Sequence, residues 1–261
     1  MKKILLLILV LGLCAGLCLP AFAVSTTQDK LLTLVNPWNT IPEDWTVELI
    51  SIGNGHRVDK ICYDDLMAMM DACRAAGLSP MVRSSYRTQS QQTDLYTNKV
   101  RQWKNYGYDE EAARIKAATI VAIPGTSEHQ LGWAVDIVDK SYQTLNEKQA
   151  ETPSQKWLME HSWEYGFILR YPVDKSDVTG IIYEPWHYRY VGRDNAKEIM
   201  ESGLCLEEYL AQGAHRTQFR EAVLAALDER SLDTVRRIFR LITRGDADFA
   251  AVGSTTDVMK P

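Results

Sequence analysis

The chain has 261 residues, of which 46% are hydrophobic and 24% charged, and its formal net charge is −5. This composition is that of a globular protein, and it excludes a disordered chain, a collagen-like chain and a small disulfide-rich scaffold. The length allows one good-sized domain or two small ones, with a core that needs no structural metal. The negative charge disfavours a nucleic-acid-binding protein, because duplex binding usually needs a basic surface.

The first 23 residues have the pattern of a secretory signal peptide. Lys2 and Lys3 precede an apolar run over residues 4–19, and residues 21–23 (Ala-Phe-Ala) match an A-x-A cleavage site. We therefore expect an extracytoplasmic protein, in the cell wall or periplasm, with no membrane span once the signal is cleaved. The alternative is an uncleaved N-terminal anchor, since the apolar run is nearly long enough to cross a bilayer.

Three cysteines follow the predicted signal peptide: Cys62, Cys73 and Cys205. Three thiols cannot all pair within one chain. If the helix predicted at Cys62 and Cys73 is continuous, the two residues lie about 16 Å apart. A disulfide needs Cα atoms within roughly 7 Å, so this pair cannot bond. We expect buried free thiols, with a bond from Cys62 or Cys73 to Cys205 as the alternative.

Helices and short strands alternate along the predicted domain. Residues 24–58 are predicted to be irregular, because Asn-Pro and Ile-Pro steps mark turns. Apolar spacing and capping residues then predict the following elements: a helix ending near Gly77, a strand at 81–82, a helix from Thr88 to about Gly107 and a helix from 109 to about 122. Further along, the predicted elements are strands at 133–138, 167–169 and 181–183, and helices at 154–165 and 194–202.

The pattern changes near the C-terminal end of the chain. After Gly213 two amphipathic helical stripes follow, with no zinc-ligand or catalytic pattern. The predicted organisation is a signal peptide at 1–23, a main domain at 24–205 and a helical C-terminal extension at 206–261 with a disordered end. We expect the extra helices to pack on the domain or on a partner.

Two histidines and one aspartate have the chemistry of an open metal site. His129 lies in a predicted loop just before a strand, and His187 follows another apolar segment. Asp136 lies inside the strand among apolar neighbours, where a carboxylate is costly to bury unless it is paired or bound to a cation. Two imidazoles and one carboxylate suit zinc with a fourth position open, where a bound water becomes a usable nucleophile.

Glu184 and Arg87 supply two further catalytic functions. Glu184 lies three residues before His187 and could take a proton from water as general base. Arg87 offers a planar positive fork that can hold a carboxylate or stabilise an oxyanion. Each residue alone also has an ordinary structural explanation, such as Asp136 pairing with a buried arginine. Gly132 suits a tight turn into the strand.

Two motifs give a specific resemblance. Residues Ser127–Asp136 match S-x-H-x-x-G-x-A-x-D, and Glu184–His187 match E-x-W-H, about fifty residues further on. In this order and at this separation they resemble the VanY-type zinc D,D-carboxypeptidases, a family related to the VanX dipeptidases. Ser84–Thr88 resembles the family's S-G-Y-R-S stretch, with Ser85 at the glycine position and Thr88 at the last serine position, two departures that concern only the local shape of the loop. The resemblance covers roughly residues 32–205.

The resemblance implies a fold and a role for each site residue. The implied fold is a small α+β zinc peptidase domain with a central antiparallel sheet and flanking helices. The implied zinc ligands are His129, Asp136 and His187. Glu184 would be the catalytic base, and Arg87 would bind substrate or stabilise the transition state. The residues expected near the substrate are Tyr86, Gln92 and Ser127.

The leading hypothesis is a secreted zinc-dependent D,D-carboxypeptidase that removes the terminal D-Ala from peptidoglycan stem peptides. One alternative is an L,D-carboxypeptidase of the same family, which acts on tetrapeptide stems. An alternative of another class is a non-catalytic cell-wall binding protein on the same fold. Serine chemistry is disfavoured, because the sequence contains neither S-x-x-K nor G-x-S-x-G.

Overall fold

The computed structural model describes residues 30–213. The predicted signal peptide and all but the first residues of the predicted C-terminal extension lie outside the described residues. The chain divides into two units between Cys205 and Leu206, and the fold described here is that of the first. Among residues 30–213 there is no helix with the length and apolar character needed to span a membrane.

Four antiparallel strands form the central sheet, in the order β3-β4-β6-β5. Their bounds are Pro80–Ser84 for β3, Ala134–Asp139 for β4, His187–Tyr190 for β6 and Phe167–Leu169 for β5. A separate antiparallel hairpin consists of β1 (Leu49–Gly53) and β2 (His56–Asp59). The expected α+β fold with a central antiparallel sheet is confirmed.

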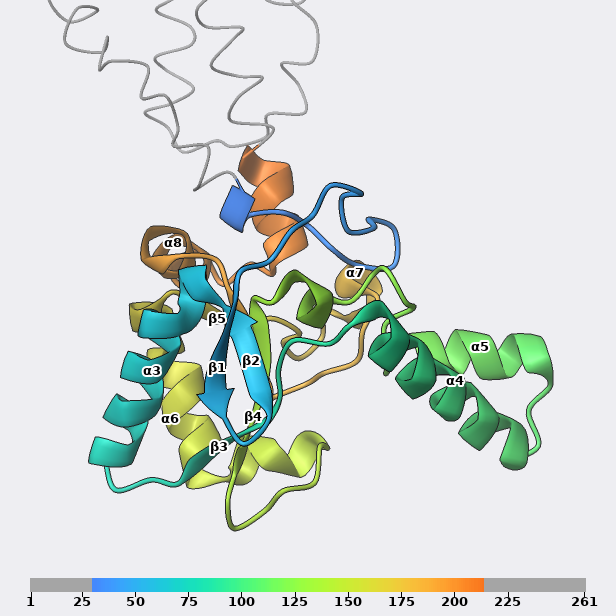
Figure 1. Cartoon of the computed structure of the whole chain (residues 1–261), viewed down its shortest axis with the longest axis horizontal. Coiled ribbons are helices and arrows are strands. Elements are labelled where there is room, and N and C mark those ends of the chain that lie inside the picture. Colours follow the sequence, from blue (N-terminus) through green and yellow to red (C-terminus); the bar gives the residue numbers. More distant parts are fainter. Residues whose placement is uncertain (1–29, 214–261) are drawn as a thin grey trace, which may run out of the picture. The chain divides into compact units, whose positions relative to one another are not determined.

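The helices form two groups around this sheet. Helices α3 (Lys60–Ala75) and α6 (Pro153–His161) lie together on one side of the sheet (Figure 1). Helices α4 (Gln89–Asn105) and α5 (Glu110–Ala118) pack on each other and project away from it (Figure 1). The remaining elements are η1 (Glu128–Leu131), η2 (Glu147–Glu151), η3 (Ser162–Tyr165), α7 (Ser176–Thr179) and α8 (Arg193–Ser202).

The pleat of the strands divides apolar from charged residues. Successive side chains of a strand point to opposite faces of the sheet. Val135, Ile137 and Tyr188 belong to the main buried core, whereas Asp136 and His187 alternate with them and face the other side. Other members of this core come from the helices and from β5: Leu66, Met69, Cys73, Leu158 and Phe167. The main core therefore lies on the side of the sheet opposite to the charged residues.

Local sequence signals set most helix ends as predicted. Thr88 caps α4 through a reciprocal pair of hydrogen bonds with Gln91. Asp109 caps α5, which ends at Ala118, earlier than expected.

Both Cys62 and Cys73 lie in α3 as buried free thiols, as expected for a continuous helix.

Two predictions about strands are wrong. Residues 181–183 form no strand, and the strand begins instead at His187, because it is β6 that pairs with β4. Residues 49–58, within the segment 24–58 predicted to be irregular, form all but the last residue of the β1–β2 hairpin. Its turn uses Gly53, Asn54 and Gly55 with φ angles of 88°, 52° and 79°, the left-handed conformation that glycine and asparagine favour.

Candidate active site

Sheet register brings the three predicted metal ligands together. Asp136 of β4 lies directly opposite His187 of β6, and η1 delivers His129 just before β4 begins. All three side chains are buried, and one candidate ligand atom from each lies within 4.8 Å of the others. The structure thus brings together the three residues that the sequence predicts as metal ligands, and these residues could hold a metal ion.

Gly132 sets the turn between His129 and β4. It ends η1 with a φ of +80°, a left-handed conformation that disfavours side chains with a Cβ. A Cβ at this position would lie 3.2 Å from the Cβ of Asp59 and 3.3 Å from its backbone nitrogen. The close approach of β2 therefore adds to the backbone requirement, and the predicted tight turn is present.

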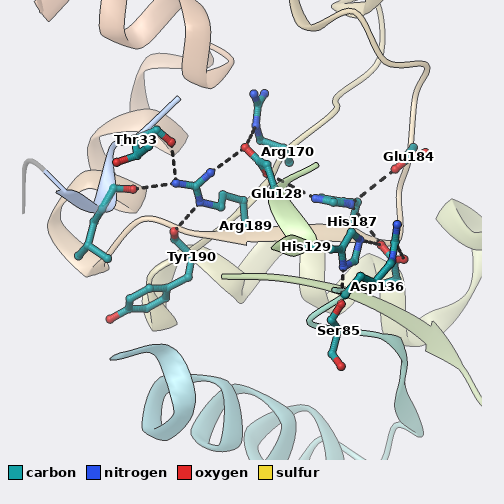
Figure 2. Close-up of polar contacts among 12 residues, drawn as sticks. Thr33, Ser85, Glu128, His129, Asp136, Arg170, Glu184, His187, Arg189 and Tyr190 are labelled. Atoms are coloured by element: carbon teal, nitrogen blue, oxygen red, sulfur yellow. Dashed lines mark hydrogen bonds and ion pairs between the residues drawn. The ribbon is translucent and has the colours of Figure 1, made fainter. Parts of the chain in front are cut away.

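The three side chains leave unsatisfied polar atoms pointing at one another. His129 Nε2 and His187 Nδ1 lie 3.3 and 3.2 Å from the same oxygen, Asp136 Oδ1. His129 donates its Nδ1 proton to the Ser85 carbonyl at 2.9 Å, so Nε2 is the atom left for a metal (Figure 2). Within the described residues, His129 Nε2 and Asp136 Oδ1 are buried without a hydrogen-bond partner. Such atoms are costly, and a cation would satisfy them.

The electrostatics of the cluster favour metal binding by neutral imidazole and ionised carboxylate. Burial, together with the charge of Arg87, lowers the pKa of His129 to about 4. Burial raises the pKa of Asp136, but interactions with His129 and His187 hold it well below its usual value. Burial lowers the pKa of His187, but its interactions with Asp136 and Glu128 raise it to about 9. His187 is therefore the residue of the cluster whose proton a metal would have to displace.

Glu184 is the carboxylate beside the cluster. Its Oε2 atom lies 3.6 Å from His187 Nδ1, and the side chain is buried. Burial, together with the negative charge of Asp136, raises the pKa of Glu184 to about 8. A carboxyl group with a pKa near neutrality, next to a metal position, can both accept and return a proton.

Arg87 faces the second carboxylate oxygen of Asp136 and is held by three contacts. Its Nη2 atom lies 3.3 Å from Asp136 Oδ2, and its Nε donates to Ser84 Oγ at 3.1 Å. Its Nη1 donates to Gln92 Oε1 at 2.8 Å, and Gln92 Nε2 donates to the Ala122 carbonyl at 2.7 Å. Both polar atoms of Gln92 are thus used within the protein, so Gln92 braces Arg87.

A cavity of about 720 Å³ opens onto these groups. That volume is in the range of small-molecule sites. Its polar lining includes Arg87, Ser127, His129, Asp136, Glu184 and His187. Its apolar lining includes Leu95, Ile120, Val121, Ile181 and Ile182. Of the residues predicted near the substrate, Ser127 lines the cavity; Tyr86 is not among its lining residues, and the Arg57 guanidinium lies 5.7 Å from its ring centroid.

Comparison with protein families decides the identity of this domain. The profile described as VanY, D-alanyl-D-alanine carboxypeptidase, matches residues 55–193, just over half of the chain. The chain belongs to the VanY family. The expected family is confirmed, and the expected class of enzyme, a metallocarboxypeptidase, is the class of this family.

Individual VanY proteins are similar over most of the described domain. A D-alanyl-D-alanine carboxypeptidase of Enterococcus faecalis (strain ATCC 700802 / V583) is 48% identical over 184 residues, which cover 70% of this chain and 66% of that protein. This chain thus spans just under two thirds of the relative's length. A solved VanY D,D-pentapeptidase variant in complex with Zn(II) is 46% identical, with a TM-score of 0.63 over 69% of this chain and 98% of that one.

Two further structures extend the comparison. VanYB in complex with D-alanine-D-alanine is 46% identical, with a TM-score of 0.65 over 70% of this chain and 98% of that chain. The LD-carboxypeptidase LdcB is 34% identical, with a TM-score of 0.59 over 71% of this chain and 88% of that chain. The fold is therefore shared by relatives named for two different bond specificities.

Sequence analysis missed one group of charges behind the VanY site. Glu128, Arg170 and Arg189 are buried, and both arginines contact Glu128, which lies beside His187 (Figure 2). The signal was present, since Arg170 follows the apolar strand 167–169 and Arg189 lies between two tyrosines. A lone charge among apolar residues is the pattern that identified Asp136.

Proposed function

We propose that the protein is a zinc-dependent D,D-carboxypeptidase that hydrolyses the terminal D-Ala-D-Ala bond of peptidoglycan stem peptides. The observation that carries this proposal is the buried cluster of His129, Asp136 and His187, which opens onto the cavity. Two nitrogens and one carboxylate oxygen suit zinc and leave a position for water. The Zn(II) and D-alanine-D-alanine complexes of the VanY relatives support the choice of metal and substrate.

His129, Asp136 and His187 would hold the zinc ion, and Glu184 would act as base. Zinc, when bound, supplies Lewis acidity and brings the pKa of a bound water towards about 7. Glu184 takes one proton from the attacking water and returns it to the amine nitrogen as the carbon–nitrogen bond breaks. The hydroxide oxygen stays on the carbonyl carbon, which becomes the new carboxylate.

Arg87 would stabilise the oxygen that becomes negative during attack. Its guanidinium is fixed by Ser84 and Gln92 before substrate binds, so no reorganisation is needed at the moment of reaction. The apolar wall of the cavity suits short side chains such as the methyl group of alanine. Ser127 lines the same cavity, and its hydroxyl would hydrogen-bond the peptide.

We also propose that the enzyme acts outside the cytoplasm, in the cell wall or periplasm. The predicted signal peptide at residues 1–23 supports export, and the proposed substrate lies outside the cytoplasm. The partners are therefore stem peptides of peptidoglycan, and the negative net charge argues against nucleic acid.

The test is release of D-Ala from two peptides by the purified protein. One peptide ends in D-Ala-D-Ala, and the other is a tetrapeptide stem that ends in a single D-Ala. The proposal predicts release from the first peptide, loss of release with a chelator and recovery when zinc is restored. The matched control is Glu184→Gln, which should bind zinc and release almost no D-Ala.

The other outcomes assign the two alternatives. Release only from the tetrapeptide would make the protein an L,D-carboxypeptidase. The similarity to the LD-carboxypeptidase LdcB is the reason to include this peptide. Peptide binding without release, in protein shown to contain zinc, would favour the non-catalytic wall-binding protein. Activity that is unchanged by the chelator would contradict metal-dependent hydrolysis.

A further inference from the structure

Glu128 lies in a buried charge cluster directly behind the proposed zinc ligand His187. Arg170 Nε donates to Glu128 Oε1 at 2.7 Å, and Arg189 Nη1 donates to the same oxygen at 2.8 Å (Figure 2). All three side chains have no exposed area. Burying three charges carries a large desolvation cost, and apolar residues of similar volume often give equal or higher stability. Stability alone is therefore a weak explanation of this cluster.

The second oxygen of Glu128 faces His187. Glu128 Oε2 lies 3.5 Å from His187 Nε2, a few tenths of an ångström beyond a hydrogen bond. Within the described residues, neither atom has a hydrogen-bond partner. The contacts of Arg170 and Arg189 with Glu128 fall on Oε1, so Oε2 is left for the imidazole. The other ring nitrogen, His187 Nδ1, faces Asp136 and Glu184.

We propose that Glu128 is a positioning residue that accepts the Nε2 proton of His187 and so presents Nδ1, unprotonated, to the metal. The proposal rests on the proposed role of His187 as a zinc ligand. Metal-binding histidines usually donate their second N–H to a carboxylate or a carbonyl, which fixes the ring and its tautomer. His129 already shows this arrangement with the Ser85 carbonyl, and Glu128 completes it for the second imidazole.

Arg189 extends the positioning to the start of the domain. Its Nη2 atom donates to the carbonyls of Leu31 and Thr33 at 3.1 and 2.9 Å, and its Nε donates to the Tyr190 carbonyl at 3.0 Å. These contacts fix the guanidinium that holds Glu128 Oε1. The segment at residues 31–33 therefore contributes to the orientation of His187 through Arg189 and Glu128, although it contributes no side chain to the site.

The test variant is Glu128→Gln. The two arginines need an acceptor, so they hold the amide oxygen and turn the NH₂ group towards His187 Nε2. A donor there favours the tautomer with a proton on Nδ1. We expect zinc affinity, measured by competition with a chromophoric chelator, to fall by about 10- to 100-fold. The d–d spectrum of the cobalt-substituted protein should shift as well. Unchanged zinc affinity and an unchanged spectrum in a folded variant would overturn the proposal.

The matched control is Asp65→Asn, which also removes a carboxylate from an arginine. Asp65 pairs with Arg193 at 2.6 Å and accepts from the Tyr190 hydroxyl at 2.7 Å. This change should lower the melting temperature of the chelator-treated protein and leave zinc affinity unchanged. If both variants weaken zinc binding equally, the role of Glu128 is general stability, and the proposal is contradicted.

A measurement on the unmodified protein tests which nitrogen of His187 binds the metal, and it does so even if Glu128→Gln does not fold. The full chain is loaded with ¹¹³Cd and studied by NMR with ¹⁵N-labelled histidine. We expect cadmium coupling to Nδ1 of His187 and a proton on Nε2 that exchanges slowly with solvent. Coupling to Nε2 instead would overturn the role of Glu128 and leave the proposed function intact. Absence of any coupling to His187 would contradict the proposed metal site itself.

Discussion

In β4 and β6, the face towards α3 and α6 carries Val135, Ile137 and Tyr188, whereas the opposite face carries Asp136 and His187. The apolar face is part of the main buried core. The charged face is also buried, yet within residues 30–213 it keeps polar atoms without hydrogen-bond partners. Neighbouring residues of the same strands thus serve two different purposes. Burial of the apolar face stabilises the fold, and part of that free energy offsets the cost of burying the charges on the other face.

Removing the base should give the largest effect, and only on the charged face. Glu184→Gln keeps the shape of the side chain and removes its capacity to accept a proton. We expect kcat to fall by about 10²- to 10⁴-fold, the usual contribution of a general base, while zinc content and melting temperature stay near those of the parent. Steady-state kinetics and metal analysis on the same sample check this. A variant with a near-normal rate would remove Glu184 from that role.

The converse change should damage the apolar face and spare the site. Ile137→Ala leaves a cavity in the core beneath β4, and we expect it to cost about 2–5 kcal/mol of unfolding free energy. Urea denaturation of the chelator-treated protein measures this loss. The kcat/KM of the folded, zinc-loaded variant should stay within about threefold of the parent, within the spread that indirect effects produce. A large loss of kcat/KM at full zinc occupancy would show that the two faces are not separable.

Arg87→Lys sharpens the comparison within the charged face. Lysine keeps the positive charge but cannot contact Ser84, Gln92 and the substrate oxygen at once, as the planar fork can. We expect kcat/KM to fall by about 10²-fold, in line with the loss of one oxyanion donor. Gln92→Met, which removes only the brace, should cause a smaller loss. Equal rates for Arg87→Lys and the parent would place Arg87 outside the reaction.

Zinc affinity should depend on pH through His187. Its pKa is raised to about 9, so below that pH the imidazole carries a proton that must leave before zinc binds. Between pH 8 and pH 6, affinity should therefore weaken by about tenfold for each unit that the pH falls. Chelator competition across this range measures the slope. Affinity that is flat with pH would contradict the protonation state assigned to His187.

Much of this arrangement could be predicted from the sequence, because its signals are local. The position of Asp136, alone in an apolar strand, singled it out, and Thr88, as a helix-capping residue type, identified the start of α4. Patterns of residue types at short spacing report burial and capping directly. The histidine positions within the two motifs then led to the metal cluster.

The remaining features depend on pairing between distant segments. Which apolar stretch forms the strand beside β4 is decided by the register that sets Asp136 opposite His187, so residues 181–183 were assigned wrongly. Glu128 lies 42 residues from Arg170 and 61 from Arg189, so no pattern within a short stretch of sequence predicts that these three side chains contact. Gln92 was expected near the substrate, but its contact with Ala122 becomes visible only when the helix pair α4–α5 is in place.

The central claim is that His129, Asp136 and His187 hold one zinc ion at the base of the cavity. X-ray diffraction from crystals of the full chain grown with zinc, recorded on both sides of the zinc absorption edge, tests it most directly. The account predicts one strong anomalous peak bonded to these three side chains, with Glu184 beside it and not bonded. A peak elsewhere, or no peak at these residues in protein that releases D-Ala, would contradict it.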